Sequence, residues 1–246
     1  MFKEIVKKIV YREKSNSESY ISYLRKIGCS IGNNTVIYVP NKTYIDITRP
    51  YLIHIGNNVK ITEGVTILTH GYDWSVLEEC YHEILGSAGE IRIGNNVFIG
   101  MNTTILKGVH IGNNVIIGAA SLINKDIPDN SVVAGNPAKF ITTVDMYYEK
   151  RKAAQIDEAF CIYKNYRERW NEETDIPKEC FHEFFWLFEC EFSGDRLTEK
   201  SWDHMMSALN YERYKKTKHT FESYEDFIRY CKLRYQDEKG SRRYDS

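Results

Sequence analysis

The sequence lacks the features that mark exported, membrane-spanning or polyanion-binding proteins. Its 246 residues have a formal net charge of −1, so there is no electrostatic reason to expect tight binding to nucleic acid or to an anionic membrane. No window has the roughly 20 apolar residues of a transmembrane helix. The six cysteines are scattered without C-x-x-C spacing, which favours reduced thiols. We therefore expect a cytoplasmic protein that does not bind nucleic acid and is not an integral membrane protein.

The N-terminal segment, residues 1–11, mixes three lysines with isoleucine and valine. It lacks both the uninterrupted apolar stretch and the small-residue cleavage site of a secretory signal. The pattern predicts a short amphipathic helix.

What the sequence does contain is a six-residue repeat. One tract places an isoleucine at every sixth position, at Ile93, Ile99, Ile105, Ile111, Ile117 and Ile123. An earlier tract repeats the spacing at Ile55, Ile61 and Ile67, and a fragment of it occurs at Ile31 and Ile37. A sustained period of this kind defines the architecture of a whole domain.

A period of six fits neither a helix of 3.6 residues per turn nor simple strand alternation. It fits a three-sided coil in which each hexad is a short strand and a corner, with the isoleucine pointing inward. I-G-N-N tetrads begin at residues 31, 55, 93 and 111, and glycine and asparagine tolerate the dihedral angles of tight corners. Antiparallel hairpins would instead show turn signals between alternating strands. We therefore predict a mainly β protein built on a left-handed parallel β-helix, an exception to the usual right-handed crossover.

Changes in the repeat predict the domain organisation. Residues 27–141 form the β-helix, and residues 1–26 a helical cap at one end. The hexad register is lost after His70 and returns near Ile91, so residues 71–90 should leave the β-helix as a protruding loop, where binding residues often gather. After Ile141 the period stops and a capping-box pattern begins. We predict a helical extension over 142–246, which packs on itself or on the open coil end or, as the functional alternative, recognises an acceptor or partner.

Four motifs occur in order along the repeat: N-N-V-F-I-G at 95–100, G-A-A-S at 118–121, K-D-I-P at 125–128 and A-G-N-P-A-K at 134–139. They resemble those of the hexapeptide acyltransferases, in particular the galactoside, maltose and nodulation-factor O-acetyltransferases and the acetyltransferases of capsule and O-antigen clusters. The resemblance covers a little over half of the chain. It implies acetyl-CoA as the acyl donor, a sugar or polysaccharide-precursor hydroxyl as the acceptor, a homotrimer and no metal.

The resemblance also implies that His70 is the general base, since it follows an early coil just before the protruding loop. A neutral imidazole suits removal of a proton from a hydroxyl near neutral pH. The hydroxyl would then attack the acetyl carbonyl directly, without a covalent enzyme intermediate. Asn102 is a candidate amide for the developing oxyanion.

The sequence departs from its relatives directly after this histidine. Where polysaccharide-cluster relatives commonly carry an acid, this chain has Gly71, and Asp73 comes two residues later. Asp73 is therefore a candidate to orient His70 or to bind sugar hydroxyls, and Trp74 a candidate to stack on a pyranose.

The CoA site is likewise implied by the resemblance, in the groove between two β-helices of a trimer. Ala119 would offer backbone hydrogen bonds. Asn124, Lys125 and Lys139 match positions that contact the pantetheine or the phosphates, and a lysine is a suitable partner for phosphate.

The remaining histidines and the rival functions complete the analysis. His54 and His110 each precede a core isoleucine and should point outward, while His82 is a candidate substrate contact in the loop. No two histidines have the spacing of a γ-type carbonic anhydrase zinc site. An aminosugar N-acetyltransferase and an antibiotic O-acetyltransferase share the base and the donor, and both stay open as alternatives.

Overall fold

The computed structural model describes residues 6, 9–170, 176–188, 192–193, 196–197 and 208–242. The chain divides into two compact units, Met1–Glu149 and Lys150–Ser246. The predicted helix over residues 1–11 lies mostly outside the described residues.

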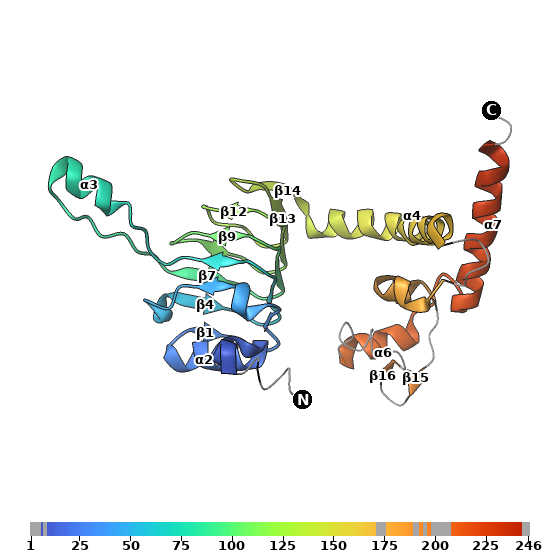
Figure 1. The fold of residues 1–246 in the computed structure, drawn as a ribbon, viewed down its shortest axis with the longest axis horizontal. Helices are drawn as coiled ribbons and strands as arrows, with labels where there is room; N and C mark the ends of the chain where they lie inside the picture. Colours follow the sequence, from blue (N-terminus) through green and yellow to red (C-terminus); the bar gives the residue numbers. More distant parts are fainter. Residues whose placement is uncertain are drawn as a thin grey trace. The chain divides into compact units, whose positions relative to one another are not determined.

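Unit 1 is built from three sheets (Figure 1). Up to Ile123, successive strands along the chain belong to the first, the second and the third sheet in turn. The first sheet has the order β1 (Ser30–Ile31), β4 (Ile53–Ile55), β7 (Ile91–Ile93) and β10 (His110–Ile111). The second contains β2 (Val36–Ile37), β5 (Lys60–Ile61), β8 (Val97–Ile99), β11 (Val115–Ile117), β13 (Ser131–Ala134) and β14 (Lys139–Thr143). The third contains β3 (Tyr44–Ile45), β6 (Thr66–Ile67), β9 (Thr104–Ile105) and β12 (Leu122–Ile123).

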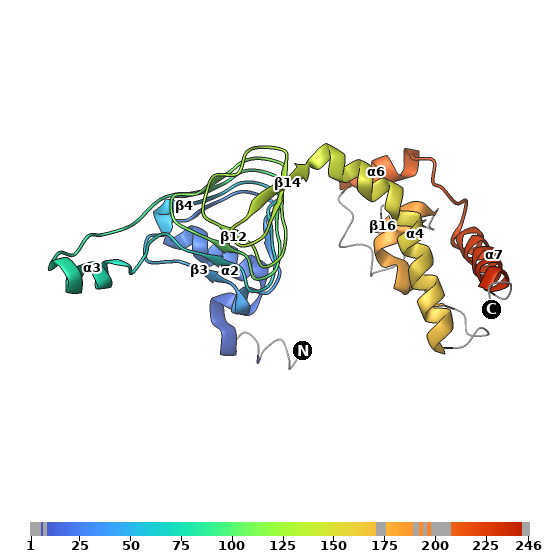
Figure 2. The same ribbon diagram turned by 90° about the horizontal axis from the view of Figure 1, so that it is seen from above.

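The strand register confirms the predicted parallel β-helix. Pairing between neighbouring coils is parallel and places isoleucine on isoleucine, as in the ladders of Ile55 with Ile93 and of Ile67 with Ile105. The isoleucines of the main tract are at most 3% exposed, so each coil buries the apolar face of the next. Viewed from above, the coils of unit 1 superimpose as a rounded triangle (Figure 2). The three sheets fit a left-handed β-helix.

The corners of successive coils stack into three edges, which we name by their residues. The His70 edge follows the third sheet and contains residues 46–48, 68–70, 106–108 and 124–126. The Asn102 edge follows the second sheet and contains residues 62–64, 100–102 and 118–120. The asparagine edge follows the first sheet and contains residues 32–34, 56–58, 94–96, 112–114 and 128–130.

In the I-G-N-N corners the glycine and the two asparagines have different roles. The second asparagine takes the left-handed conformation, with φ of 58° at Asn58 and 56° at Asn96. The first asparagine links coils, since the side chain of Asn95 accepts a hydrogen bond from the backbone N–H of Asn57 at 2.8 Å. Glycine is required for a reason that the dihedral argument missed: a Cβ on Gly94 would lie 2.6 Å from the carbonyl oxygen of Gly112.

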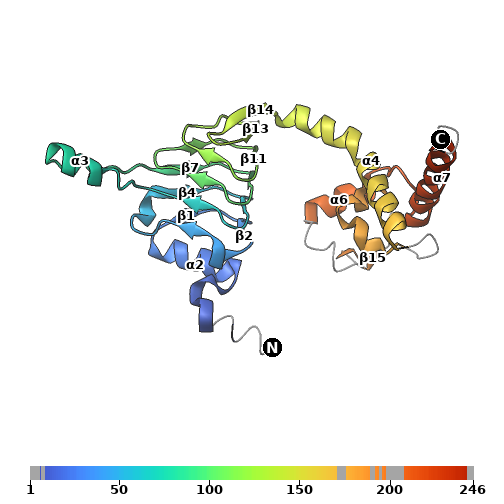
Figure 3. The ribbon, with the colours of Figure 1, turned by 45° about the horizontal axis from the view of Figure 1, so that its top comes forward.

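One end of the β-helix is covered by α2 (Ser17–Ile27), which follows η1 (Arg12–Ser15) (Figure 3). The side chain of Asn16 caps the helix by accepting the N–H of Ser19 at 2.9 Å. Tyr20 and Leu24 join the isoleucine core, so the helix buries the face that the first coil would otherwise expose to water. Short 3₁₀ turns, η2 (Pro40–Lys42) and η3 (Pro50–Leu52), complete the early corners.

Residues 71–90 leave the β-helix as an arm, and this arm carries the helix α3 (Trp74–Tyr81) (Figure 1). Antiparallel hydrogen bonds hold its base together: Gly71 N–H donates to the carbonyl of Ser87, and Gly89 N–H to that of Thr69. The loop predicted from the lost register therefore contains a helix on a two-stranded stem.

The predicted boundary between residues 141 and 142 falls within a strand. β14 pairs antiparallel with β13 through Thr142 and Thr143, because the β-branched residues at this point extend the second sheet. The helix α4 (Val144–Trp170) begins directly afterwards, and the side chain of Thr143 accepts the N–H of Met146 at 3.2 Å.

Unit 2 is mainly helical and has its own aromatic core. Besides most of α4 it contains η4 (Lys178–Leu187), α6 (Ala208–Lys216) and α7 (Tyr224–Arg242). Phe160, Phe181, Phe188 and Phe227 are among its buried residues. A hairpin of β15 (Phe192–Ser193) and β16 (Arg196–Leu197) lies within the extension predicted to be helical. Across the described residues of both units, no helix is long and apolar enough to cross a membrane.

Candidate active site

His70 lies where the arm leaves the His70 edge. It comes after β6, beyond Leu68 and Thr69, and forms an antiparallel bridge with Ala88 on the returning strand of the arm. Its backbone is therefore fixed by the β-helix on one side and by the stem of the arm on the other. A rigid scaffold of this kind holds a reactive side chain in one geometry.

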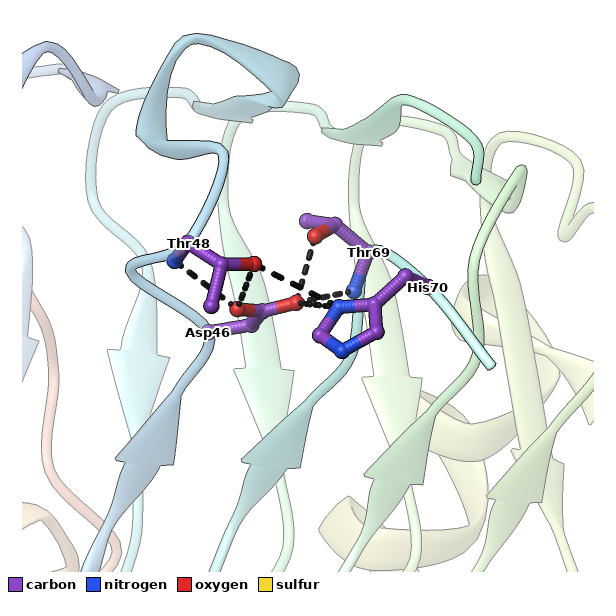
Figure 4. A network of polar contacts seen from close by, with 4 residues as sticks. All are labelled: Asp46, Thr48, Thr69 and His70. Atoms are coloured by element: carbon purple, nitrogen blue, oxygen red, sulfur yellow. Dashed lines mark hydrogen bonds and ion pairs between the residues drawn. The ribbon is translucent and has the colours of Figure 1, made fainter. Parts of the chain in front are cut away.

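The imidazole is held by a carboxylate from the preceding coil (Figure 4). Nδ1 of His70 lies 2.6 Å from Oδ2 of Asp46. Asp46 follows β3, and β3 pairs in register with β6, so coil stacking brings the two residues together. Nε2 lies on the side of the ring away from the carboxylate (Figure 4).

The Asp46 carboxylate is fully buried and accepts hydrogen bonds at both oxygens. Oδ1 accepts from the backbone N–H of Thr48 at 2.9 Å and from its hydroxyl at 2.7 Å. Oδ2 accepts from the backbone N–H of Thr69 at 3.1 Å and from its hydroxyl. A buried carboxylate costs free energy unless it is bonded in this way.

The same hydrogen bonds decide the charge of Asp46. Burial alone would raise its pKa, but the hydrogen bonds from Thr69 and Thr48 outweigh burial and hold the pKa well below its ordinary value. The carboxylate is therefore ionised at neutral pH and can only accept, so Nδ1 of His70 must donate. In neutral imidazole the lone pair is then on Nε2. This arrangement makes Nε2 a base that can take a proton from a hydroxyl.

The structure places Asp46 in the orienting position, for which the sequence offered Asp73 as a candidate. Asp73 precedes α3, and its Oδ1 lies 2.4 Å from where a Cβ on Gly71 would stand. Its carboxylate thus packs over the Gly71 backbone, and within the described residues no hydrogen bond joins it to His70. The correction has a simple reason: neighbours along a loop diverge, whereas residues one coil apart stack.

Within one chain, Asn102 lies on a different edge from His70. It takes φ of 58° at a corner of the Asn102 edge, and its N–H donates to the carbonyl of Glu63. The third sheet separates this edge from the His70 edge. A single chain therefore does not bring the predicted oxyanion amide to His70.

The predicted CoA residues are also divided between edges. Asn124 and Lys125 stand exposed on the His70 edge and line a pocket with Ala138 and Phe140. Lys139 is exposed on β14, between Ala138 and Phe140 in the chain. Ala119 is exposed on the Asn102 edge.

Among the described residues of unit 1, no other histidine forms a hydrogen bond or ion pair with Asp46. His54 and His110 point outward from the first sheet, as predicted, and their Nε2 atoms lie 2.9 and 4.0 Å from the carboxylate of Glu90. His82 is exposed at the end of α3 in a left-handed conformation. In the parts of the chain that the structure describes, no group of three or more histidine, cysteine or acidic residues is arranged to hold a metal ion.

Asp46, Thr48 and Thr69 were not predicted as site residues. A signal was present, because Ile45 and Ile67 occupy the same position in hexads one coil apart. Aligning the two coils places Thr48 opposite His70, and Asp46 two positions before Thr48. The carboxylate therefore falls within two aligned positions of the imidazole.

The buried carboxylate predicts a pH dependence of stability. Because the folded-state pKa of Asp46 lies below the unfolded value of about 3.9, the unfolded chain takes up this proton at higher pH than the folded chain. The stabilisation from Asp46 is thus complete above the unfolded pKa and is lost as the pH falls through the folded pKa. We expect Asp46→Asn to be less stable than wild type at pH 7 in urea unfolding, and the difference to shrink between pH 5 and pH 3. Glu79→Gln, which removes an exposed carboxylate of α3, is the control, and a difference for Asp46→Asn that stays constant over this range would contradict the argument.

Comparison with known proteins agrees with this architecture. Residues 90–125 match the family model described as bacterial transferase hexapeptide (six repeats). Protein CapG of Staphylococcus aureus is 46% identical over 127 residues, which are 52% of this chain and 73% of CapG. Galactoside O-acetyltransferase of Escherichia coli is 40% identical over 110 residues, 43% of this chain and 49% of that enzyme. A maltose O-acetyltransferase structure from Clostridium difficile is 29% identical, with a TM-score of 0.38 over 51% of this chain and 75% of that one.

The six-residue repeat and the similar proteins place the chain in a class of acyl-transferring enzymes. The chain belongs to the hexapeptide-repeat acetyltransferase family, because it covers more than two thirds of CapG at 46% identity and matches the family's repeat model. It is accordingly an acyltransferase. The matches fall within a little over half of the chain.

Proposed function

We propose that the protein is an acetyl-CoA-dependent O-acetyltransferase that acts on a sugar or polysaccharide-precursor hydroxyl, with His70 as the general base. The observation that carries the proposal is the pair of His70 and buried Asp46, which leaves Nε2 as the accepting nitrogen at the foot of the arm. The name of the galactoside O-acetyltransferase among the similar proteins supports a sugar acceptor.

The reaction follows from this geometry. Nε2 takes the proton of the acceptor hydroxyl as its oxygen attacks the acetyl carbonyl, and Asp46 stabilises the imidazolium that forms. The tetrahedral intermediate collapses by breaking the C–S bond, so the acetyl group stays on the sugar oxygen. The CoA thiolate leaves and recovers the proton from Nε2. No covalent enzyme intermediate is needed, and His70 is neutral again at the end.

In this proposal the donor lies in a groove between two β-helices. Lys125 and Lys139 supply positive charge for the CoA phosphates, and Asn124 and the backbone of Ala119 bind the pantetheine. The pocket beside Asn124 and Lys125 supports their assignment.

A second copy of the chain completes the site. Asn102 and Ala119 stand on one edge of the β-helix, whereas His70 and Lys125 stand on another. If the Asn102 edge of one copy lies beside the His70 edge of the next, base, amide and CoA groups all line the same groove. Repeating this contact around an axis closes a ring, and we propose that the ring is a homotrimer.

Acceptor-dependent release of thiol from acetyl-CoA tests the proposal. The purified protein is incubated with acetyl-CoA and, separately, with methyl glucopyranoside, methyl galactopyranoside, methyl mannopyranoside, glucosamine and chloramphenicol. We expect thiol release with at least one methyl glycoside and an acetyl ester in the product by mass spectrometry. An amide formed only with glucosamine would identify an aminosugar N-acetyltransferase. Turnover with chloramphenicol alone would identify a drug acetyltransferase. Either of these two results would refute the present proposal.

A further inference from the structure

The arm carries an aromatic pair immediately beside the base. The ring of Tyr72 makes an edge contact with the imidazole of His70, with centroids 5.0 Å apart and planes at 72°. The ring of Trp74 lies 6.1 Å further on, tilted by 48° to Tyr72. The two rings therefore lead outward from His70 along the start of the arm.

Folding does not explain the exposure of Tyr72. Tyr72 is 70% exposed, although an aromatic ring of its size gains free energy when its faces are covered. The ring is near His70 because the stem of the arm fixes the backbone of Gly71. The position of Tyr72 is thus determined locally, while its faces are left open to solvent.

Polar groups around the two rings indicate which kind of ligand could cover them. Asp73 stands between the two aromatics in the chain and is exposed, as is Glu78 on α3. Carboxylates repel an anionic ligand but accept hydrogen bonds from hydroxyl groups. A hexopyranose can cover an aromatic ring and also donate hydrogen bonds to carboxylates. Its C–H groups form an apolar patch that meets the negative face of an aromatic ring, and its hydroxyls lie around the rim.

We propose that Tyr72 and Trp74 form an acceptor platform, which binds the C–H face of a pyranose ring and presents one of its hydroxyls to Nε2 of His70. The inference rests on the proposed function and makes it narrower: the acceptor is a cyclic sugar, and open-chain polyols and simple alcohols are poor substrates. Tyr72 is the specificity-determining residue because its ring touches that of the base. Asp73 accepts a hydrogen bond from a ring hydroxyl and so limits rotation of the sugar on the platform.

Binding is tested separately from catalysis. Saturation-transfer NMR with the methyl hexopyranosides, without acetyl-CoA, should show transfer from the wild-type protein to the ring C–H protons. Tyr72→Ala should abolish this transfer and Tyr72→Phe should retain it, since phenylalanine keeps the ring. Tyr81→Ala is the matched control, because Tyr81 is 72% exposed on the same arm but lies at the far end of α3.

Kinetics give the second readout. In the wild type, kcat/KM should be higher for the best methyl hexopyranoside than for the alditol of the same sugar, so the ratio of the first value to the second should exceed one. In Tyr72→Ala we expect this ratio to fall about tenfold, mainly through a higher KM for the pyranoside, with the KM for acetyl-CoA unchanged.

Three outcomes would overturn the platform. These are a Tyr72→Ala variant that keeps the NMR transfer and the KM of wild type, a Tyr81→Ala variant with the same loss, or a change of oligomeric mass in Tyr72→Ala, which would make the ring a contact between copies. Failure of the proposed function shows differently: the wild-type protein then binds methyl hexopyranosides but releases no thiol from acetyl-CoA.

Discussion

Replacement of His70 by alanine should lower the kcat of acceptor-dependent acetyl transfer by about 10²- to 10⁴-fold, the usual contribution of a general base. The variant still binds acetyl-CoA, so the KM for the donor should stay within about twofold of wild type. Thiol release under saturating acceptor measures both. The large effect is expected because no other histidine in the described part of the chain contacts Asp46.

The matched control is His110→Ala. His110 is a histidine of the same β-helix, but it points outward from the first sheet beside Glu90. It should retain wild-type kcat. A His70→Ala variant with more than a tenth of wild-type kcat, in a protein whose wild type turns over, would remove His70 from the role of base.

Replacement of Gly94 by alanine should lower the free energy of unfolding by about 3 kcal/mol, at the upper end of the usual cost of overpacking. The added Cβ would lie 2.6 Å from the carbonyl oxygen of Gly112 and 3.0 Å from the nitrogen of Asn113. These are backbone atoms of the next coil, so no side chain can move aside. The coils must separate locally, which weakens the ladder between β7 and β10.

Urea unfolding followed by circular dichroism measures this loss. Gly86→Ala is the control, because a Cβ at Gly86 on the arm meets nothing within 4 Å, and it should change stability by less than about 0.5 kcal/mol. Equal stability of the two variants would show that the corner relaxes at no cost, contrary to the packing argument.

The hexad pattern was sufficient to predict the β-helix and the residues that fill it. Ile99, Ile105 and Ile117 are fully buried because a period of six returns every strand to the same face of a three-sided coil. The place where the arm leaves was also predictable, since it is the point at which the period stops. Both features depend on spacing along the chain, which the sequence states directly.

Domain boundaries were less accessible to this reasoning. The strand β14 continues the second sheet to Thr143 by antiparallel pairing, a contact that has no six-residue signature. The helix α3 on the arm was missed for a related reason: eight residues with a weak apolar pattern are too few to distinguish a helix from a loop.

The candidate site divides in the same way. His70 was predicted as the base from the sequence, because its motif and its place before the arm are local features. Its partner was not: Asp73 was chosen for nearness in the chain, whereas Asp46 lies 24 residues earlier and 2.6 Å away in space. Asn102 was assigned to the same centre, yet it stands on another edge.

The sequence by itself determined the coil, its isoleucine core and the exit of the arm, and it supplied the candidate base, since each depends on residue type and spacing. Only the tertiary structure decided which side chains meet. Stacking one coil on the next brings Asp46 beneath His70 and puts Gly94 against Gly112, while the three-sided cross-section sends Asn102 to a different edge. A repeat specifies the position of each residue around its coil, but a contact between coils depends on how the coils stack in space, which the strand pairing and the corners decide.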